Sequence, residues 1–288
     1  MKKSFLAIMT MSTLALAAVV GCGTSNSTGN SAGAENSTSG NSTSGDKTSA
    51  IGVTAKVDTN ATPSPDKIVV GTDNTYPPME YMDPNDPSKL IGFDVDLGDA
   101  LSKYLHKEIV WKPTQWDGII PGLTSDKYDL IISSMNDTEE RRKTIDFVDY
   151  GNWGQAIVVK ADSNDSIHTI NDLKGKTVGV QIATTSDEAL KKEGGVTIKE
   201  YNTFPDAFQD LANGRLDAAV VDESVARYYV NIQSGKYKIV GQTFMSLPVG
   251  IGLRKDETQL ESDIKKALNE MKADGTYNKI YAYWFGSK

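Results

Sequence analysis

The sequence predicts an α/β protein with mostly parallel sheets. The first observation behind this prediction is that short apolar strands alternate with helical segments along the chain. The second is that the alternation occurs in two series, each followed by an extended apolar segment, at residues 155–160 and 249–254. Two such segments at matching points indicate two crossovers between two lobes. A single continuous sheet remains the alternative, because periodicity alone does not separate the two arrangements.

The first series of elements begins after Lys67. In chain order we expect a strand at 68–70, a helix at 94–106, a strand at 109–111, a short helix at 117–123, a strand at 130–132 and a helix starting near Thr138. Thr138 is a favourable first residue for a helix because Glu139 and Glu140 follow it in the first turn.

The second series repeats this order of strands and helices. We expect a strand at 177–180, a helix at 184–192, a strand at 198–201, a helix at 207–213, an apolar strand at 216–221 and a helix starting at Asp222. Two amphipathic helices, at 257–273 and 276–284, end the chain and are expected to return to the first lobe.

The N-terminal residues have the pattern of a secretory signal. Lys2 and Lys3 precede an apolar run at residues 4–20, which is too short to span a membrane comfortably. The run ends in VVGC at residues 19–22, which resembles the lipobox of bacterial lipoproteins. This resemblance implies a signal peptide at 1–21 and a lipidated Cys22, which would anchor the protein at the extracytoplasmic face of the cell membrane. The alternative is an ordinary secretory cleavage site with an unrelated cysteine.

Residues 22–65 are predicted to be a flexible tether that starts at Cys22. Ser, Thr, Gly and Asn dominate this segment, and the pentamer NSTSG occurs twice, at 36–40 and 41–45. Such a composition cannot bury enough apolar surface to offset the entropy lost on ordering. The folded part of the chain is therefore expected to begin near residue 66.

Composition argues against several classes of function. The chain of 288 residues has a formal net charge of -8, which disfavours a nucleic-acid partner. Its single cysteine allows neither an internal disulfide nor a thiolate zinc site. Its two histidines, His106 and His168, fall in segments expected at the surface. We therefore expect no metal, no cofactor and no catalytic residue.

Polar and charged residues follow three of the expected strands. In open α/β sheets, ligands bind beyond the carboxyl ends of strands and near helix N-termini. The residues at these three strand ends are Ser133, Ser134, Met135, Asn136 and Arg141; Gln181, Thr184 and Thr185; and Asp222. An arginine suits a carboxylate and an aspartate suits an ammonium group, so together they suit a small zwitterion. Taken singly, each residue also fits a helix cap or a solvated helical turn.

Motifs along the chain from about 67 to 286 resemble the bacterial extracellular solute-binding proteins of family 3, the polar amino-acid class. The motifs that carry this resemblance are GTDNTYPP at 71–78, IGFDVDL at 91–97, WDGIIP at 116–121, YDLIIS at 128–133, TEER at 138–141, DLKGK at 172–176, GRLDA at 214–218, ADGTY at 273–277 and IYAYWFG at 280–286.

The resemblance implies a two-lobed periplasmic-binding-protein-like (type II) fold, whose two hinge strands let the lobes close on a ligand. Lobe 1 would comprise residues 66–156 and 251–288, and lobe 2 residues 157–250. The implied function is the extracytoplasmic binding of a free polar or basic amino acid and its delivery to the permease subunits of an ABC importer. The protein would act as a monomer held at the membrane by its lipid anchor.

The resemblance also implies a role for individual residues. Arg141 would bind the α-carboxylate of the ligand, helped by Ser133, Ser134 and Thr185, and Asp222 would bind its α-ammonium group. Tyr76 and Trp116 would enclose the ligand side chain, with Asp73 at the far end of the pocket. Met135, Asn136, Gln181 and Thr184 complete the candidate site because they lie at the same strand ends.

The identity of the ligand stays open at this stage. Several positions differ from the residues that are common in the family, namely Met79, Asn136, Asp137, Ala183 and the segment 149–153. Asp73 and Glu80 would favour a basic ligand such as arginine or lysine. Asp73 also suits a glutamine-type ligand, however, and Glu80 would have no such role if it lies on the surface.

Two other functions are compatible with this fold. Some of its members are dehydratases of cyclic carboxylic acids, of the cyclohexadienyl or arogenate type, and such an enzyme would need a general acid in the cleft. Others are sensory receptor modules for amino acids. Amino-acid binding without turnover would separate a binding protein from the enzyme.

Overall fold

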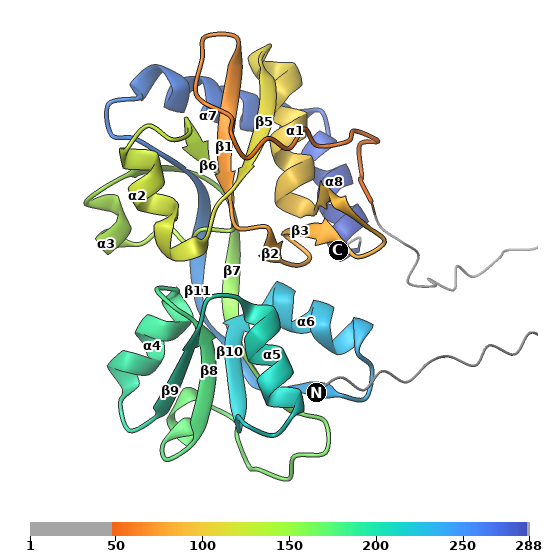
Figure 1. Ribbon diagram of the computed structural model, residues 1–288, viewed down its shortest axis with the longest axis vertical. Helices are drawn as coiled ribbons and strands as arrows, with labels where there is room; N and C mark the ends of the chain where they lie inside the picture. The colour runs from red at the N-terminus through yellow and green to blue at the C-terminus, as the bar shows by residue number, and fades with distance from the viewer. Residues whose placement is uncertain (1–47, 287–288) are drawn as a thin grey trace, which may run out of the picture. The chain divides into compact units, whose positions relative to one another are not determined.

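A computed structural model describes residues 48–286, so Cys22, the predicted signal peptide and the first part of the predicted tether lie outside the described residues (Figure 1). The described chain has the predicted α/β architecture and forms two lobes. Two long strands, β7 (Asp146–Lys160) and β11 (Tyr237–Leu253), connect them. We found no helix among residues 48–286 that is both long enough and apolar enough to cross a membrane.

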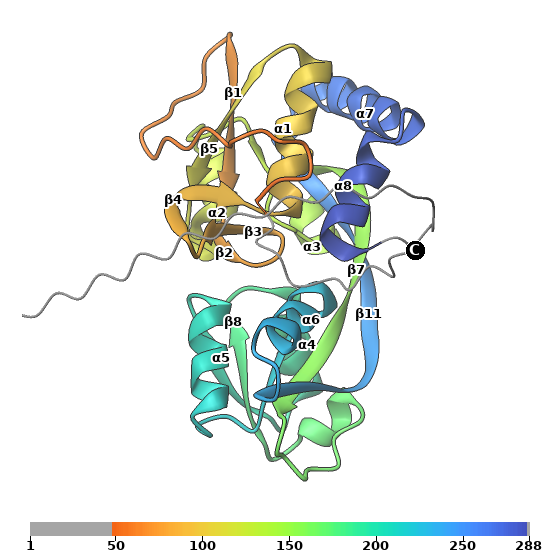
Figure 2. The same ribbon diagram turned by 90° about the vertical axis from the view of Figure 1, so that its right-hand side faces the viewer.

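Lobe 1 is built on parallel strands in the order β5 (Glu108–Pro113), β1 (Lys67–Thr72) and β6 (Leu130–Ile131). A small antiparallel sheet follows β1 and contains β2 (Thr75–Tyr76), β3 (Glu80–Asp83) and β4 (Asp86–Ile91). The helical elements of this lobe are α1 (Phe93–Leu105), η1 (Trp116–Gly118), α2 (Ile119–Thr124), α3 (Glu139–Arg142), α7 (Thr258–Ala273) and α8 (Thr276–Phe285). Helices α1, α7 and α8 pack against one another, whereas α2 packs on β1 and β6 (Figure 2).

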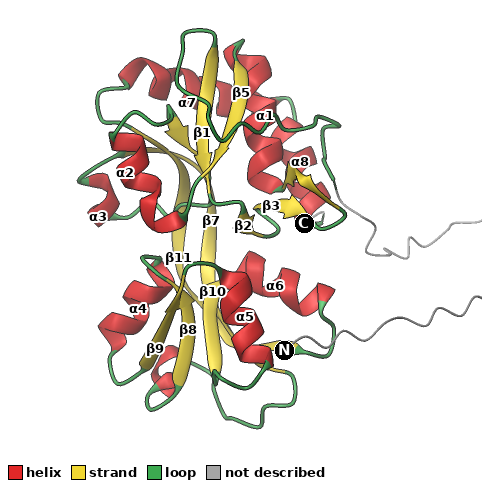
Figure 3. Ribbon diagram, in the orientation of Figure 1, coloured by secondary structure: helices red, strands yellow, loops and turns green. Residues whose placement is uncertain are grey.

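Lobe 2 is built on parallel strands in the order β10 (Ala218–Asp222), β8 (Thr177–Gln181) and β9 (Thr197–Tyr201). Its helical elements are η2 (Ile170–Leu173), α4 (Thr185–Glu193), α5 (Phe204–Ala212) and α6 (Glu223–Ile232). Figure 3 shows α4 on one side of the strands and α5 and α6 on the other. Helices on both faces explain why β10 is buried at every position and reads as an apolar run in the sequence.

Strands β7 and β11 pair antiparallel and belong to both lobes. β11 borders β6 in lobe 1, and β7 borders β10 in lobe 2, so eight strands form one sheet in the order β5-β1-β6-β11-β7-β10-β8-β9. The sequence left two lobes joined by crossovers and a single continuous sheet as alternatives. The structure combines them, because β7 and β11 cross between the lobes and also belong to one continuous sheet. The register of the pair shifts between Val240 and Phe244 and again between Phe244 and Leu247, which interrupts the ladder between the lobes.

Threonine caps fix where three helices begin after strands or turns. Thr138, Thr184 and Thr203 each accept a hydrogen bond from a backbone N–H in the first turn of α3, α4 and α5, respectively. Asp222 occupies the corresponding position before α6, but its side chain makes no capping bond. It is therefore free to point toward other partners.

The described end of the predicted tether packs on lobe 1. Ser49 Oγ and Ala50 N both donate to the Asp96 carboxylate at 2.6 Å, and Val57 pairs with Trp111 at the edge of β5. Ala61 is only 2% exposed. Residues 48–61 thus protect an open sheet edge and do not form a free linker.

Candidate functional site

A cavity between the lobes is lined by residues from the carboxyl ends of the strands, as the strand-end argument predicts. Its volume is about 20 Å³, room for roughly one water molecule. Eleven of the twelve predicted site residues line it, namely Asp73, Tyr76, Trp116, Ser133, Ser134, Asn136, Arg141, Gln181, Thr184, Thr185 and Asp222.

One of the twelve predicted site residues does not line the cavity, and two residues outside that set do. The side chain of Met135 is fully buried in a hydrophobic cluster with Val69, Ile119 and Phe147, and does not line the cavity. Glu80 does not lie on the surface: it is 1% exposed and lines the cavity. Ser186 also lines the cavity but was not predicted, because its position in the first turn of α4 gives no separate signal.

Arg141 is a buried cation without an ion-pair partner. Its Nη1 donates to the backbone oxygen of Asn136 at 2.9 Å and its Nη2 to that of Ala183 at 3.2 Å, while the guanidinium lies 5.2 Å from the ring centre of Trp116. Burial lowers the pKa of Arg141 from its usual value. Among residues 48–286, no carboxylate lies within ion-pair distance of it. Buried charges are normally paired, so this guanidinium is suited to an anion from outside the chain.

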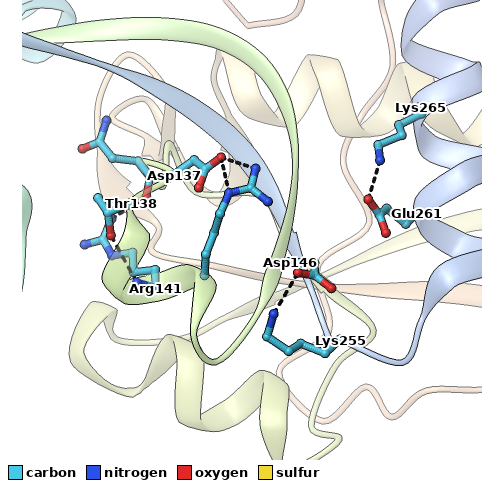
Figure 4. Close-up of polar contacts among 9 residues, drawn as sticks. Asp137, Thr138, Arg141, Asp146, Lys255, Glu261 and Lys265 are labelled. Atoms are coloured by element: carbon cyan, nitrogen blue, oxygen red, sulfur yellow. Dashed lines mark hydrogen bonds and ion pairs between the residues drawn. The ribbon is translucent and has the colours of Figure 1, made fainter.

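The start of α3 explains this orientation. Thr138 caps the helix and accepts from Arg141 N at 3.2 Å, which holds the first turn beside the strand ends (Figure 4). The next residue, Arg142, is half exposed and forms an ion pair with Asp137 on the surface. Two consecutive arginines thus have opposite environments, one buried without a counter-ion and one exposed with a counter-ion.

Asp222 is the matching buried anion, and it has no cationic partner within ion-pair distance in the described part of the chain. Its carboxylate accepts from Tyr76 Oη at 2.7 Å and from Gln155 Nε2. Burial raises the pKa of Asp222 to about 6 despite these donors. Gln155 was not predicted, although a polar residue opening the apolar run of 155–160 was a usable signal. We call Arg141 and Asp222, with their neighbours Asn136 and Thr185, the Arg141 end of the cavity.

Three further carboxyl groups, those of Asp73, Glu80 and Asp94, form what we call the acidic end. Asp73 accepts from Gln181 Nε2 and Thr75 Oγ1, each at 2.6 Å. Glu80 accepts from Ser133 Oγ at 3.0 Å, and Asp94 accepts from Tyr150 Oη at 2.8 Å.

Burial raises the pKa of every carboxyl group at the acidic end. The pKa of Asp94 rises to about 6, and that of Glu80 lies well above its usual range because burial adds to the nearby charges of Asp94 and Asp73. Burial also raises the pKa of Asp73, although its hydrogen bonds to Thr75 and Gln181 oppose the shift. The acidic end therefore holds protons more tightly than exposed carboxylates do.

Direct hydrogen bonds join the lobes across the cavity. Tyr76 bonds to Asp222, Gln181 bonds to Asp73, and Thr185 Oγ1 donates to Asn136 Oδ1 at 2.7 Å. Such bonds occupy the same polar groups that a ligand would use. A ligand larger than a water molecule must therefore exchange with them, which requires movement of the lobes or side chains.

The backbone of Ala183 is strained and adds two hydrogen bonds between the lobes. Its φ of 59° lies in the left-handed region, where a side chain is disfavoured by roughly 1–2 kcal/mol. This conformation directs its carbonyl oxygen to Arg141 Nη2 and to Trp116 Nε1, the latter at 3.1 Å. Strain at such a position is commonly associated with functional sites.

The chain was compared with known proteins. The model of the family described as bacterial extracellular solute-binding proteins, family 3, matches residues 68–287. The L-cystine-binding protein TcyJ of Escherichia coli K12 is 36% identical over 222 residues, which covers 76% of this chain and 83% of that protein.

Solved structures of amino acid-binding proteins are also similar to this chain. An ancestral arginine-binding protein, solved with arginine, is 49% identical with a TM-score of 0.74, covering 77% of this chain and 99% of that one. The same kind of protein solved with glutamine is 48% identical with a TM-score of 0.74, covering 78% and 100% of the two chains. An ancestral amino acid-binding protein described as a precursor of cyclohexadienyl dehydratase is 39% identical with a TM-score of 0.72, covering 76% and 96%.

Proposed function

The chain belongs to the bacterial extracellular solute-binding proteins of family 3, and from this membership we propose that it binds a free amino acid and delivers it to an ABC importer. The relatives are binding proteins: TcyJ is named for cystine, and the ancestral protein was solved with arginine and with glutamine. All three ligands are amino acids with different side chains. The common recognition element is therefore the amino-acid backbone.

One observation carries this proposal. The cavity is lined by a buried cation, Arg141, and a buried anion, Asp222, neither of which has an ion-pair partner among residues 48–286. A zwitterion with a carboxylate and an ammonium group supplies both missing partners. Each charge-assisted hydrogen bond contributes about 1.5–3 kcal/mol net, which offsets the penalty of removing the ligand charges from water.

We propose the following mode of binding. Arg141 holds the α-carboxylate through two parallel bonds, and Asp222 accepts from the α-ammonium group in place of Tyr76. Tyr76 and Trp116 enclose the side chain, which points toward the acidic end. The ligand replaces the direct hydrogen bonds between the lobes, so that residues 66–156 with 251–288 and residues 157–250 close on it about β7 and β11.

We also propose that the protein is a lipoprotein. Residues 1–21 would be removed as a signal peptide, and lipidated Cys22 would hold a monomeric binding domain outside the cell membrane, near the permease subunits of its importer. The basis is the lipobox-like VVGC at 19–22. Replacement of Cys22 by Ser should release the protein into the soluble fraction, and unchanged membrane fractionation of Cys22→Ser would exclude the anchor.

An enzymatic function is the alternative that one observation favours. Glu80 is a buried carboxyl group in the cavity with a raised pKa, which is the kind of group that serves as a general acid. A relative is also described as a precursor of a dehydratase. That relative is itself an amino acid-binding protein, and we propose binding without turnover for this chain as well. Intact ligand recovered after prolonged incubation is the expected result.

A thermal-shift screen tests the proposal. Free L-amino acids, including L-cystine, L-arginine and L-glutamine, are compared with derivatives whose α-amino group is acetylated or whose α-carboxylate is amidated. We expect at least one free amino acid to raise the unfolding temperature and its two blocked derivatives to have no effect. If no free amino acid stabilises the protein, or if the blocked forms do so equally, the proposal is wrong.

A further inference from the structure

In the described part of the chain, the acidic end contains three buried carboxyl groups and no cation. Asp73, Glu80 and Asp94 are 4%, 1% and 0% exposed. None of them forms an ion pair within the described residues, and the largest influences on the pKa values of Glu80 and Asp94 are burial, neighbouring carboxyl groups and hydrogen bonds. Burial lowers the pKa of Arg141, a cation that lines the cavity, and the nearby charges of Glu188 and Asp222 oppose this shift without forming an ion pair. Residues 48–286 therefore do not neutralise the acidic end.

Hydrogen bonding singles out Glu80 within this group. Asp73 and Asp94 accept from donors on both oxygens, whereas Glu80 Oε2 is buried and has no donor among residues 48–286. Glu80 and Asp94 accept from the consecutive residues Ser133 and Ser134, and the nearby charge of Asp94 adds to burial in raising the pKa of Glu80. Two neighbouring buried carboxylates cannot both be ionised at low cost, whereas a proton held between them would satisfy the unpartnered oxygen of Glu80.

The described groups around Glu80 and Asp94 do not supply a cation either. Besides burial, the negative charges of Asp94 and Asp73 raise the pKa of Glu80. The charge of Asp117 in η1 likewise adds to the raised pKa of Asp73. Tyr76, Tyr150 and Tyr277 face the pair from β2, β7 and α8. Burial raises the pKa of all three tyrosines, so they stay neutral near neutral pH. The positive charge at this end must therefore be either a proton or a charge carried by the ligand.

We propose that Glu80 and Asp94 share one proton, which a ligand with a cationic side chain displaces into the solvent, whereas an amino acid with a neutral side chain binds with this proton retained. This inference rests on the proposed amino-acid binding and adds the side-chain selectivity of that same cavity. In the first case the carboxyl O–H bond breaks, the proton passes to a buffer base, and the guanidinium or ammonium group of the ligand takes its place. In the second case the carboxyl O–H bond stays intact and the shared proton remains between Glu80 and Asp94.

This exchange links selectivity to pH with a definite sign. A cationic ligand competes with a proton, so its affinity increases as pH rises and the proton becomes easier to remove. A neutral ligand does not compete with that proton. The ratio of the two affinities should therefore rise with pH, by at most about tenfold per pH unit for one displaced proton.

L-Arginine and L-citrulline form a matched pair of probes, because they have nearly the same shape but only arginine has a charged side chain. Titration calorimetry near neutral pH, in phosphate and in Tris buffer, gives the number of protons exchanged from the difference in apparent enthalpy. The α-groups of the two ligands are identical, so the difference between the ligands reports the acidic end. We expect about 0.5–1 more proton to be released with arginine than with citrulline.

Glu80→Gln removes the titrating group and retains a side chain of the same shape. In this variant we expect the extra proton release to disappear and the arginine-to-citrulline affinity ratio to fall by about tenfold or more. Glu270→Gln, at an exposed position on α7, is the matched control and should retain both properties. A cooperative thermal transition in each variant verifies folding.

The outcomes separate this inference from the proposed function. Equal proton release with both ligands, or proton release that persists in Glu80→Gln, would overturn the exchange. So would binding of neutral amino acids with no binding of arginine, a result that leaves the proposed function intact. Failure of every free amino acid in the thermal-shift screen would reject the proposed function and this inference together.

Discussion

Within residues 48–286, one buried cation and one buried anion at the Arg141 end of the cavity each lack an ion-pair partner, whereas three buried carboxyl groups at the acidic end lie together without a cation. The first arrangement has no net charge and complements the part that all free α-amino acids share. The second has an excess of negative charge that a proton or a ligand must compensate. One cavity thus combines a constant recognition element with a variable one, and the difference locates selectivity at the acidic end.

The largest expected effect tests the Arg141 end. Arg141→Ala or Asp222→Ala should lower amino-acid affinity by about 2–5 kcal/mol, because each change leaves a ligand charge buried and unpaired. Arg142→Ala is the matched control, since Arg142 pairs with Asp137 on the surface. Titration calorimetry measures all three, and less than a tenfold loss in both Arg141→Ala and Asp222→Ala would exclude these residues as the charge partners.

A second prediction concerns the stability of the ligand-free protein, to which both ends contribute. The pKa of Asp94 and that of Asp222 are each raised from 3.8 to about 6. The native state therefore binds more protons than the unfolded state between about pH 4 and 6, and stability falls as pH rises through this window. Each group contributes up to about 3 kcal/mol.

Urea unfolding near pH 7 and near pH 5 checks this sign. The unfolding midpoint should be higher at the lower pH, and Asp94→Asn should reduce the difference. Asp86, whose pKa is lowered to about 2 by hydrogen bonds to Ser88 and Lys89, titrates below this window and does not interfere. A midpoint that falls on acidification would show that these carboxyl groups are not held protonated by burial.

A third prediction distinguishes the two ends by the pH dependence of affinity. The α-ammonium group binds the ionised form of Asp222, so the affinity for any amino acid should fall as pH drops below about 6, by at most about tenfold per unit. A neutral ligand such as citrulline reports this effect alone, because only a cationic ligand adds the displaced proton of the acidic end. If citrulline affinity is constant between pH 7 and about pH 5, the raised pKa of Asp222 is not linked to binding.

The smallest effect concerns the backbone that joins the lobes at the Arg141 end. Ala183 has a φ of 59°, so Ala183→Gly should stabilise the ligand-free protein by about 1 kcal/mol through relief of strain. The carbonyl oxygen that accepts from Arg141 and Trp116 is retained. Ala189→Gly in the interior of α4 is the opposite control and should destabilise by a similar amount. Destabilisation by Ala183→Gly would contradict the strain.

The elements that position the Arg141 end could be predicted because their signals are local. Apolar runs mark the strands, and Thr138 and Thr184 mark the helices that follow. The lengths of α1, α7 and α8 also agree with their apolar periodicity. Strand ends and helix starts converge in any open α/β sheet, so Arg141 and Asp222 could be assigned to one site before the structure was known.

The acidic end could not be predicted to the same extent because its contacts are long-range. Glu80 lies in a four-residue strand and accepts from Ser133, which is distant in the sequence. Asp94 reads locally as an acidic first-turn residue of α1, yet it accepts from Tyr150. The packing of residues 48–61 on lobe 1 was missed for the same reason, since Val57 pairs with Trp111 and the local composition favours a linker.

The most direct test of the account is a crystal structure of the protein with L-arginine or with the amino acid that stabilises it most in the thermal-shift screen. We expect the α-carboxylate to bond to both terminal nitrogens of Arg141, the α-ammonium to replace Tyr76 at Asp222, and the side chain to extend toward Glu80 and Asp73. A ligand bound in the reverse orientation, or outside the cavity between the lobes, would contradict the account.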